Sequence, residues 1–345
     1  MTSTIAPARA DSRRAGRRRR ALPAASLGLV AVLGLSGCGL SPSASYVPQF
    51  EPGSIEPVDG AEDVSVNVVS KNFTEQLILG KILVLAAEAG GYDVTDQTNV
   101  PGSQPVRKMM VEGEGDLTIE YTGTAWITYM GHEEGIPDPH EQWEAVAEED
   151  EANDLVWGPP ATFNNTYALA VRSEYAQEHG LSTISDLHDL PVEERTLCVE
   201  AEFNSRADGL NPLLEHYGLD RDGPEMPDDN IGIYDTGAIY TATDNGDCTV
   251  GEVFATDGRI LSLDLTVLED DRQYFPAYNG SAVYNGQTLE ESPELAGIMD
   301  QIMPRLDNET LQELNAQVDV EGREPVDVAY DWMVEEGFIA EPAAG

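Results

Sequence analysis

The sequence predicts an α/β protein built from two similar units, each with a mainly parallel sheet flanked by helices. Between residues 64 and 121, apolar strands alternate with helical patterns, which is typical of this class. The same alternation begins again after residue 167. Polar and aromatic residues also gather at the predicted strand ends, where open α/β sheets bind their ligands.

The first unit begins with a period-two apolar strand over residues 64–70. A helix is expected from residue 74, because Asn72 or Thr74 can cap it, and Gly90-Gly91 ends it. The pattern then predicts a strand at 93–100, a short helix at 105–112 and a third strand at 116–121. Residues 132–155 are charge-rich and predict a surface helix.

The second unit follows an apolar strand that runs through Val171. Helices are expected at 182–187, 209–217 and 238–243, and strands at 196–199, 230–234 and 250–255. Residues 263–278 are predicted to return the chain to the first unit, and helices at 293–306, 309–318 and 325–336 to close it. The two halves share one plan without a clear internal repeat.

The N-terminus has the pattern of an export signal, predicted over residues 1–37. An arginine-rich segment precedes the apolar run 21–35, which is too short to span a bilayer. It ends Leu35-Ser36-Gly37-Cys38, similar to the lipobox of bacterial lipoproteins, and this resemblance implies cleavage before Cys38 and a lipid on its sulfur. The alternative is an ordinary secretory signal with an incidental cysteine. Residues 38–62 are predicted to be a flexible tether, which would place the protein on the extracytoplasmic face of the cell membrane.

The chain is strongly acidic, with a formal net charge of −44. Residues 1–37 hold seven Arg and one Asp, so their removal would leave 12 basic and 62 acidic residues, or −50. Such a surface repels nucleic acid, and no nucleic-acid partner is expected. The acidic residues are spread along the chain, which favours adaptation to high salt; calcium binding is the weaker alternative, because no EF-hand loop is present.

Three cysteines and five histidines are candidates for lipidation, disulfide formation or metal binding. Once Cys38 is assigned to the lipid, Cys198 and Cys248 remain in an oxidising compartment, where a disulfide between them is predicted. The histidines show no metal-ligand spacing, so we expect neither a metal nor a cofactor.

Tyrosines at strand ends suggest a binding site for a cation. Tyr121 follows a strand, Tyr167 precedes one, and Tyr278 follows a Phe-Pro turn. Each could simply be a core or rim residue. Converging in one cleft, they would attract a quaternary ammonium by about 0.5–2 kcal/mol per ring. Such an ion has no N–H to offer a carboxylate, so aromatic contacts would supply the selectivity.

Basic residues are scarce, which draws attention to Lys71 and Arg206 at strand-to-helix turns. There, together with helix N-termini, they could capture an anionic group; each could also be a surface counter-charge. Thr124 could donate its hydroxyl to the same group or cap the following helix. A ligand with a cationic end and a carboxylate end would match both the strand-end tyrosines and the group of Lys71, Arg206 and Thr124.

Four motifs resemble the substrate-binding proteins of glycine betaine/choline/carnitine (osmoprotectant) ABC importers, from about Val64 to the C-terminus. They are Ser70-Lys71-Asn72-Phe73-Thr74-Glu75-Gln76, Glu120-Tyr121-Thr122-Gly123-Thr124, Phe254-Ala255-Thr256-Asp257-Gly258 and Phe275-Pro276-Ala277-Tyr278. The resemblance implies a two-lobed, hinged, type II periplasmic-binding-protein-like fold. It also implies a cation box of Tyr121, Tyr167, Phe254 and Tyr278, and a carboxylate site of Lys71, Thr124 and Arg206. Phe254 stands where the family usually has tyrosine.

The resulting prediction is a non-enzymatic receptor for quaternary-ammonium solutes such as glycine betaine, carnitine, choline or proline betaine. It would deliver them to the transmembrane permease of an ABC transporter, with an ATPase subunit supplying energy indirectly. One lobe is predicted over 63–166 and 276–345, the other over 167–275, with crossovers near Tyr167 and Phe275 as the hinge. The alternatives are an exported α/β enzyme, with Glu120 or Asp257 as catalytic carboxylate, and a receptor for an amino-acid-like ligand or a polyamine.

Overall fold

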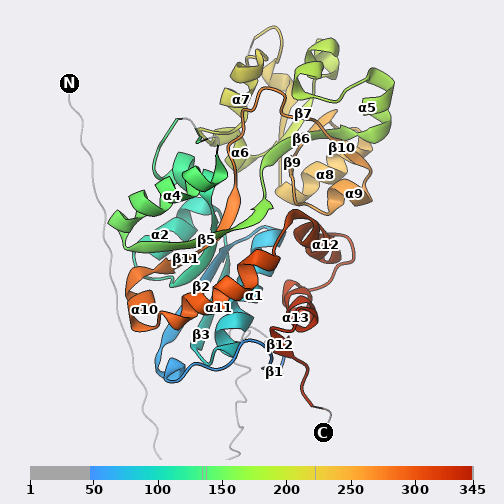
Figure 1. Ribbon diagram of the computed structural model, residues 1–345. Helices are drawn as coiled ribbons and strands as arrows, with labels where there is room; N and C mark the ends of the chain where they lie inside the picture. The colour runs from blue at the N-terminus through green and yellow to red at the C-terminus, as the bar shows by residue number, and fades with distance from the viewer. Residues whose placement is uncertain (1–46, 134, 137, 222, 344–345) are drawn as a thin grey trace, which may run out of the picture. The chain divides into compact units, whose positions relative to one another are not determined.

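Two five-stranded sheets organise the protein (Figure 1). The structure, a computed structural model, describes residues 47–133, 135–136, 138–221 and 223–343. The predicted signal peptide, the lipidation site Cys38 and the start of the tether lie outside the described residues. Among the described helices, none combines the length and apolar character needed to cross a membrane.

The first sheet has the strand order β3-β2-β4-β11-β5. Its members are β2 (Ser65–Lys71), β3 (Asp93–Val100), β4 (Leu117–Tyr121), β5 (Leu155–Asn164) and β11 (Asn279–Asn285). β2 pairs in parallel with β3 and β4, whereas β11 is antiparallel to both β4 and β5. The carboxyl ends of β2 and β4 therefore meet at one edge, which brings Lys71 close to Tyr121.

Helices cover both faces of the first sheet, and its central strands β2 and β4 are buried on both sides. Val66 and Val68 of β2 pack with α1 (Thr74–Ala89), whereas Val69 faces a second cluster with Val106 of α2 (Ser103–Val111). α1 also contacts three C-terminal helices, α11 (Glu294–Ile302), α12 (Asn308–Asp319) and α13 (Pro325–Glu335). Further helices of this lobe are α3 (Thr122–Thr124), α4 (Pro139–Asp150), which packs on β5, and α10 (Gly286–Glu291).

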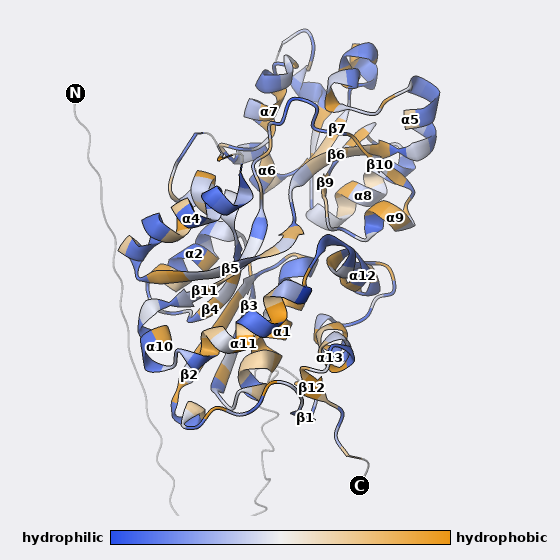
Figure 2. Cartoon of the chain, viewed as in Figure 1, coloured by the Kyte–Doolittle hydropathy of each residue, from blue (hydrophilic) through white to orange (hydrophobic). Residues whose placement is uncertain are grey.

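The second sheet has the order β10-β6-β9-β7-β8. Its strands are β6 (Tyr167–Arg172), β7 (Leu197–Glu200), β8 (Ile231–Tyr234), β9 (Val250–Phe254) and β10 (Leu265–Val267). Its helices are α5 (Ser173–His179), α6 (Ala201–Ser205), α7 (Leu210–Tyr217), α8 (Thr236–Asn245) and α9 (Arg259–Ser262). Figure 2 shows the partition of residues clearly here, since β6 is mostly hydrophobic and α5 mostly hydrophilic.

A disulfide joins Cys198 on β7 to Cys248, which precedes β9, and this is the pairing that the sequence analysis names. The two Cα atoms are 5.9 Å apart and the bridge closes a loop of 50 residues. The cysteines pack with Ile239 and Ala242 of α8. The disulfide therefore links β7 to the start of β9, and it packs under α8.

The chain passes between the two sheets twice. It leaves β5 at Asn164 and enters β6 at Tyr167, and it leaves β10 at Val267 and enters β11 at Asn279. These two passages lie where the sequence predicts the hinge crossovers, although hinge motion itself stays a prediction.

The α/β class is confirmed, but the expectation of mainly parallel sheets needs correction. In each sheet two of the four strand pairings are parallel and two antiparallel. The antiparallel half of the first sheet is made by β5 and β11, which the sequence analysis did not identify as strands. β5 contains Pro159-Pro160 and β11 begins Asn279-Gly280-Ser281, so neither has a strong strand pattern.

Two smaller expectations also differ from the structure. The predicted tether over 38–62 is wrong for its last dozen residues, because β1 (Glu51–Pro52) pairs with β12 (Ile339–Ala340) and Ile55 is fully buried. The segment is held by the buried side chains of Ile55 and Ala61 and by backbone hydrogen bonds from Ser54 and Ile55 to Gly337 and Phe338. The helix expected at 182–187 is a 3₁₀ helix over Ile184–Asp189, begun by a capping box from Thr183 to Asp186.

Candidate functional site

All seven residues predicted to form the ligand site line one cavity of about 530 Å³. They are Lys71, Tyr121, Thr124, Tyr167, Arg206, Phe254 and Tyr278. The cavity takes its lining from strand ends of both sheets. We call Lys71, Ser103, Tyr121 and Thr124 the first-sheet wall, and Tyr167, Glu200, Glu202, Arg206, Asp235 and Phe254 the second-sheet wall.

The aromatic residues of the cavity form a continuous row. Phe73 lies between Tyr121 and Phe254, with ring centroids 6.2 Å and 5.4 Å away and nearly parallel planes. Tyr167 continues the row, 5.2 Å from Phe254 and 5.8 Å, edge to face, from Tyr278. Antiparallel pairing of β6 and β9 sets Tyr167 directly opposite Phe254. Ring faces at these spacings are suited to contact a methylated ammonium.

Gly123 is needed for one end of this row. A Cβ at this position would lie 2.6 Å from the Tyr278 ring and 2.7 Å from the Ala277 carbonyl oxygen. Any side chain here would therefore displace Tyr278. Tyr278 is further fixed by its backbone N–H, which donates to the Asn164 side chain at 2.7 Å.

Lys71 is held in the first-sheet wall by a buried ion pair. Its ammonium donates to Glu120 at 2.6 Å, and both side chains are about 5 % exposed or less. The other Glu120 oxygen accepts the Tyr129 hydroxyl at 2.7 Å. A lysine ammonium has three N–H donors, so Lys71 can contact Glu120 and a ligand at once.

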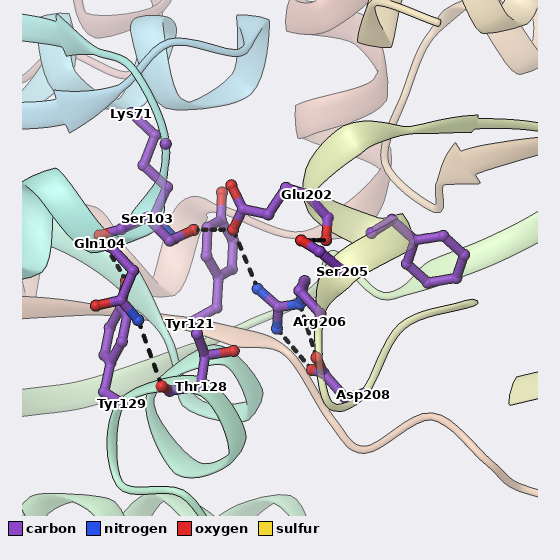
Figure 3. Close-up of polar contacts among 12 residues, drawn as sticks. Lys71, Ser103, Gln104, Tyr121, Thr128, Tyr129, Glu202, Ser205, Arg206 and Asp208 are labelled. Atoms are coloured by element: carbon purple, nitrogen blue, oxygen red, sulfur yellow. Dashed lines mark hydrogen bonds and ion pairs between the residues drawn. The ribbon is translucent and has the colours of Figure 1, made fainter. Parts of the chain in front are cut away.

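Arg206 forms more contacts with carboxylates than Lys71 does. Figure 3 shows its contacts with Asp208 and Glu202. Its guanidinium makes two bonds to Asp208, at 2.7 Å and 2.6 Å, and a longer one of 3.3 Å to Glu202. Asp208 also accepts the Tyr278 hydroxyl at 2.6 Å, and Glu202 accepts Ser103 Oγ at 2.6 Å. A chain of polar contacts therefore runs from the first-sheet wall, through Arg206, to an aromatic residue of the cavity.

Both cations already lie against aromatic faces. The Lys71 ammonium is 4.8 Å from the Tyr121 ring centroid, and the Arg206 guanidinium is 5.3 Å from that of Tyr167. These are the distances of favourable cation–π contacts. The face of each of these two rings therefore already accommodates a positive charge.

The cavity lining is acidic on balance. Its three cations are Lys71, Arg206 and Arg259, and its four carboxylates are Glu200, Glu202, Asp235 and Asp319. Three of the four carboxylates lie in the second-sheet wall. Burial and the neighbouring Glu202 carboxylate raise the pKa of Glu200. The lining thus favours ligands that carry positive charge.

Sequence reasoning missed three features of the cavity. Phe73 lies inside the quoted Ser70–Gln76 motif but resembles an ordinary residue preceding a helix. Ser103 and Glu202 meet across the cavity only because two helix starts face one another, and no local pattern signals that. In contrast, Glu200 and Asp235 directly follow or end predicted strands, so the same strand-end argument could have found them.

The carboxylates considered for catalysis are paired with cations. Among the residues that the structure describes, no group of His, Cys, Asp or Glu is arranged to hold a metal ion. Glu120 and Asp257, the carboxylates considered for catalysis, are each held by a cation, Lys71 at 2.6 Å and Arg259 at 2.5 Å. What remains available is a row of ring faces beside acidic groups and a lysine.

Comparison with known proteins agrees with this arrangement. Residues 64–335 match the family model described as the substrate-binding domain of ABC-type glycine betaine transport systems. A glycine-betaine-binding protein of Pseudomonas aeruginosa is 38 % identical over 293 residues, covering 83 % of this chain and 92 % of that protein. An ergothioneine transport permease/ergothioneine-binding protein of Helicobacter pylori is 30 % identical, covering 80 % of this chain and 48 % of that protein.

A solved glycine betaine/carnitine/choline ABC transporter structure has a TM-score of 0.66 at 26 % identity, and it covers 79 % of this chain and 99 % of that chain. The fold is therefore that of the type II periplasmic binding proteins. The family match extends over most of the described residues and includes all seven cavity residues predicted from the sequence. The chain belongs to the family of substrate-binding domains of ABC-type glycine betaine transport systems.

Proposed function

We propose that this protein is an extracytoplasmic receptor for quaternary-ammonium compatible solutes and delivers them to the permease of an ABC transporter. The single observation that carries the ligand class is the row of five rings, Tyr121, Phe73, Phe254, Tyr167 and Tyr278, in one acidic cavity. The family membership supports the receptor role.

For a zwitterion such as glycine betaine, the ammonium lies among the rings and the carboxylate lies at the first-sheet wall. Lys71 and Thr124 are the proposed carboxylate contacts. Arg206 joins them by exchanging its longest bond, the 3.3 Å contact with Glu202, for the ligand. Phe254 supplies a ring face without the hydroxyl that a tyrosine would add.

The acidic second-sheet wall supports choline as a second ligand, because choline has no carboxylate to be repelled. Carnitine and proline betaine combine a carboxylate with a larger cationic end, and about 530 Å³ of cavity gives them room. A polyamine is less favoured, since it would need the carboxylates of the cavity but also meets Lys71 and Arg206.

Calorimetric titration with glycine betaine, choline, carnitine, proline betaine and ergothioneine tests the proposal. Saturable heat with glycine betaine or choline is expected, in a one-to-one ratio. An absence of heat with all five, from a chain shown to be folded, would refute the ligand class. Chemical change of any bound solute, followed by NMR, would instead favour the alternative of an exported enzyme.

The membrane anchor is part of the proposal and rests on the sequence Leu35-Ser36-Gly37-Cys38. A signal peptide over 1–37 and a lipid on Cys38 would place the receptor beside its permease. Mass spectrometry of the mature N-terminus provides the check: a diacylglyceryl cysteine is expected, and Cys38→Ser should release the protein from the membrane fraction. An unmodified Cys38 in the membrane-bound protein would exclude the anchor.

A further inference from the structure

Behind the aromatic row lies a buried carboxylate, Glu75, in the first turn of α1. One of its oxygens accepts the Tyr121 hydroxyl at 2.7 Å and the Asn165 side-chain amide at 2.9 Å. The other accepts Thr256 Oγ1 and, at 3.5 Å, the Asn315 amide. These four donors come from different parts of the chain, so the position of the carboxylate is strongly fixed.

The direction of the bond between Tyr121 and Glu75 is determined by a neighbouring glutamine. Gln76 Nε2 donates to the Tyr121 hydroxyl oxygen at 3.1 Å and to the Ile119 carbonyl oxygen at 3.0 Å. Its Oε1 accepts the Lys71 backbone N–H at 3.1 Å, so the amide has one orientation. Because the Tyr121 oxygen accepts from Gln76, its own proton points to Glu75.

Glu75 differs from three other carboxylates near the cavity in having no cation. Glu120 is paired with Lys71, Asp208 with Arg206, and Asp257 with Arg259. In the described part of the chain, no Lys, Arg or His forms an ion pair with Glu75. Its four donors are neutral, and burial raises its pKa. A buried carboxyl without a cation favours its neutral form, and a cation brought close to it favours the ionised form.

We propose that Glu75 is the counter-charge of the ligand's ammonium and acts through the ring of Tyr121. The inference rests on the proposed function and names the residue that gives the cation box its preference for charge. Glu75 is a positioning residue, since Tyr121 stands between it and the ligand.

Two physical effects combine in this arrangement. A carboxylate that accepts a phenol proton increases the electron density of the ring, which strengthens the attraction of the ring face for a cation. The carboxylate charge also acts directly on the ammonium in an interior of low dielectric. Because the ring separates the two, a small metal cation cannot be coordinated by Glu75, and the site retains its preference for a methylated ammonium.

The test compares a charged ligand with its neutral shape mimic. Glycine betaine and 3,3-dimethylbutanoate share a carboxylate and three methyl groups, but the second has carbon in place of the ammonium nitrogen. Glu75→Gln removes the charge and keeps the size. Its affinity for glycine betaine is expected to fall on the order of tenfold, whereas its affinity for 3,3-dimethylbutanoate, measured by competition, stays as in the wild type.

Glu252→Gln is the matched control. Glu252 is buried to the same extent as Glu75 and lies on β9, two residues before Phe254, but it accepts the Glu200 backbone N–H and not the hydroxyl of a cavity tyrosine. Because Glu252 is not among the residues that line the cavity, this variant is expected to bind both compounds as the wild type does. Thermal unfolding of each variant checks that the chain is folded.

The outcomes distinguish a failure of the proposed function from a failure of the role proposed for Glu75. Failure of the wild type to bind glycine betaine counts against the proposed function. Wild-type binding with an equal loss of both compounds in Glu75→Gln, or with no loss of glycine betaine, overturns the role of Glu75. If Glu75→Gln does not fold, Tyr121→Phe decides: it keeps the ring but breaks the link, so about a threefold loss for glycine betaine alone is expected. Unchanged affinity for both compounds in that variant also overturns the inference.

Discussion

The two walls of the cavity handle charge in different ways. In the first-sheet wall, Lys71 and Glu120 neutralise one another in a buried pair. In the second-sheet wall, Glu200, Glu202 and Asp235 outnumber Arg206, and they still outnumber the cations when Arg259 of α9, which also lines the cavity, is added. Both walls stand on sheets with the same mix of parallel and antiparallel pairings, so the contrast comes from side chains and not from topology.

This difference suggests a division of roles between the walls. An excess of carboxylates creates a negative potential that attracts a cation over several ångströms. A neutralised pair creates little potential, but it holds a lysine N–H group in a fixed position for a short-range contact. The second-sheet wall would then draw the ligand in, and the first-sheet wall would orient it.

The largest expected effect comes from breaking the first-sheet pair. Glu120→Gln leaves the Lys71 ammonium buried without its counter-charge, and loss of one partner of a buried pair lowers the free energy of unfolding by about 3–5 kcal/mol. Asp208→Asn should have a smaller effect, since Arg206 keeps its contact with Glu202. Urea denaturation of both variants measures the difference, and equal losses would contradict the contrast between the walls.

The second expected effect concerns the sheet behind the second-sheet wall. The Cys198–Cys248 bridge closes a 50-residue loop, and removal of such a bridge lowers the free energy of unfolding by about 2–4 kcal/mol. The double variant Cys198→Ser/Cys248→Ser should show this loss in thermal unfolding. Reductant should lower the melting temperature of the wild type and leave the double variant unchanged. A wild type that is insensitive to reductant after unfolding and refolding would contradict a structural role.

Much of the cavity was predictable because its residues occupy strand ends. Lys71 and Tyr121 stand at the ends of apolar runs in the first unit and Tyr167 at the start of one in the second, so local pattern placed each of them at a strand end. The pairing of Lys71 with Glu120 was not predictable, since it depends on β2 and β4 being neighbours. The same holds for β11, whose central place is set by the return of the chain from the second sheet and not by its own seven residues.

The third prediction compares one ring from each wall. Tyr121→Ala should weaken glycine betaine binding at least about tenfold, through the loss of one ring face. Tyr167→Ala should weaken it further, because Tyr167 also contacts Phe254 and Tyr278 and its removal disturbs the row. Isothermal titration measures both affinities. An unchanged affinity in Tyr121→Ala would remove that residue from the site.

The smallest expected effect tests the acidic side of the comparison through pH. Burial and the Glu200 carboxylate raise the pKa of Glu252 well above its ordinary value, and among the described atoms its Oε1 has no hydrogen-bond partner. The charged groups that face it are Glu200, Glu202 and Arg206. Because the folded state binds this proton more tightly than the unfolded chain, the Glu252 contribution to stability is full below the unfolded pKa and is lost as pH rises through the folded pKa.

Glu252→Gln removes the loss of stability that accompanies rising pH. At neutral pH the variant should be more stable than the wild type by about 1 kcal/mol, since the glutamate is ionised in the unfolded chain and its buried site disfavours the ionised form, whereas the amide carries no charge in either state. As the pH is lowered towards the unfolded pKa of a glutamate, about 4.3, the wild type becomes protonated and the two free energies of unfolding should converge. Urea denaturation at several pH values measures both. A variant that is less stable than the wild type at neutral pH would show that Glu252 is held as a favourable anion and would contradict the prediction.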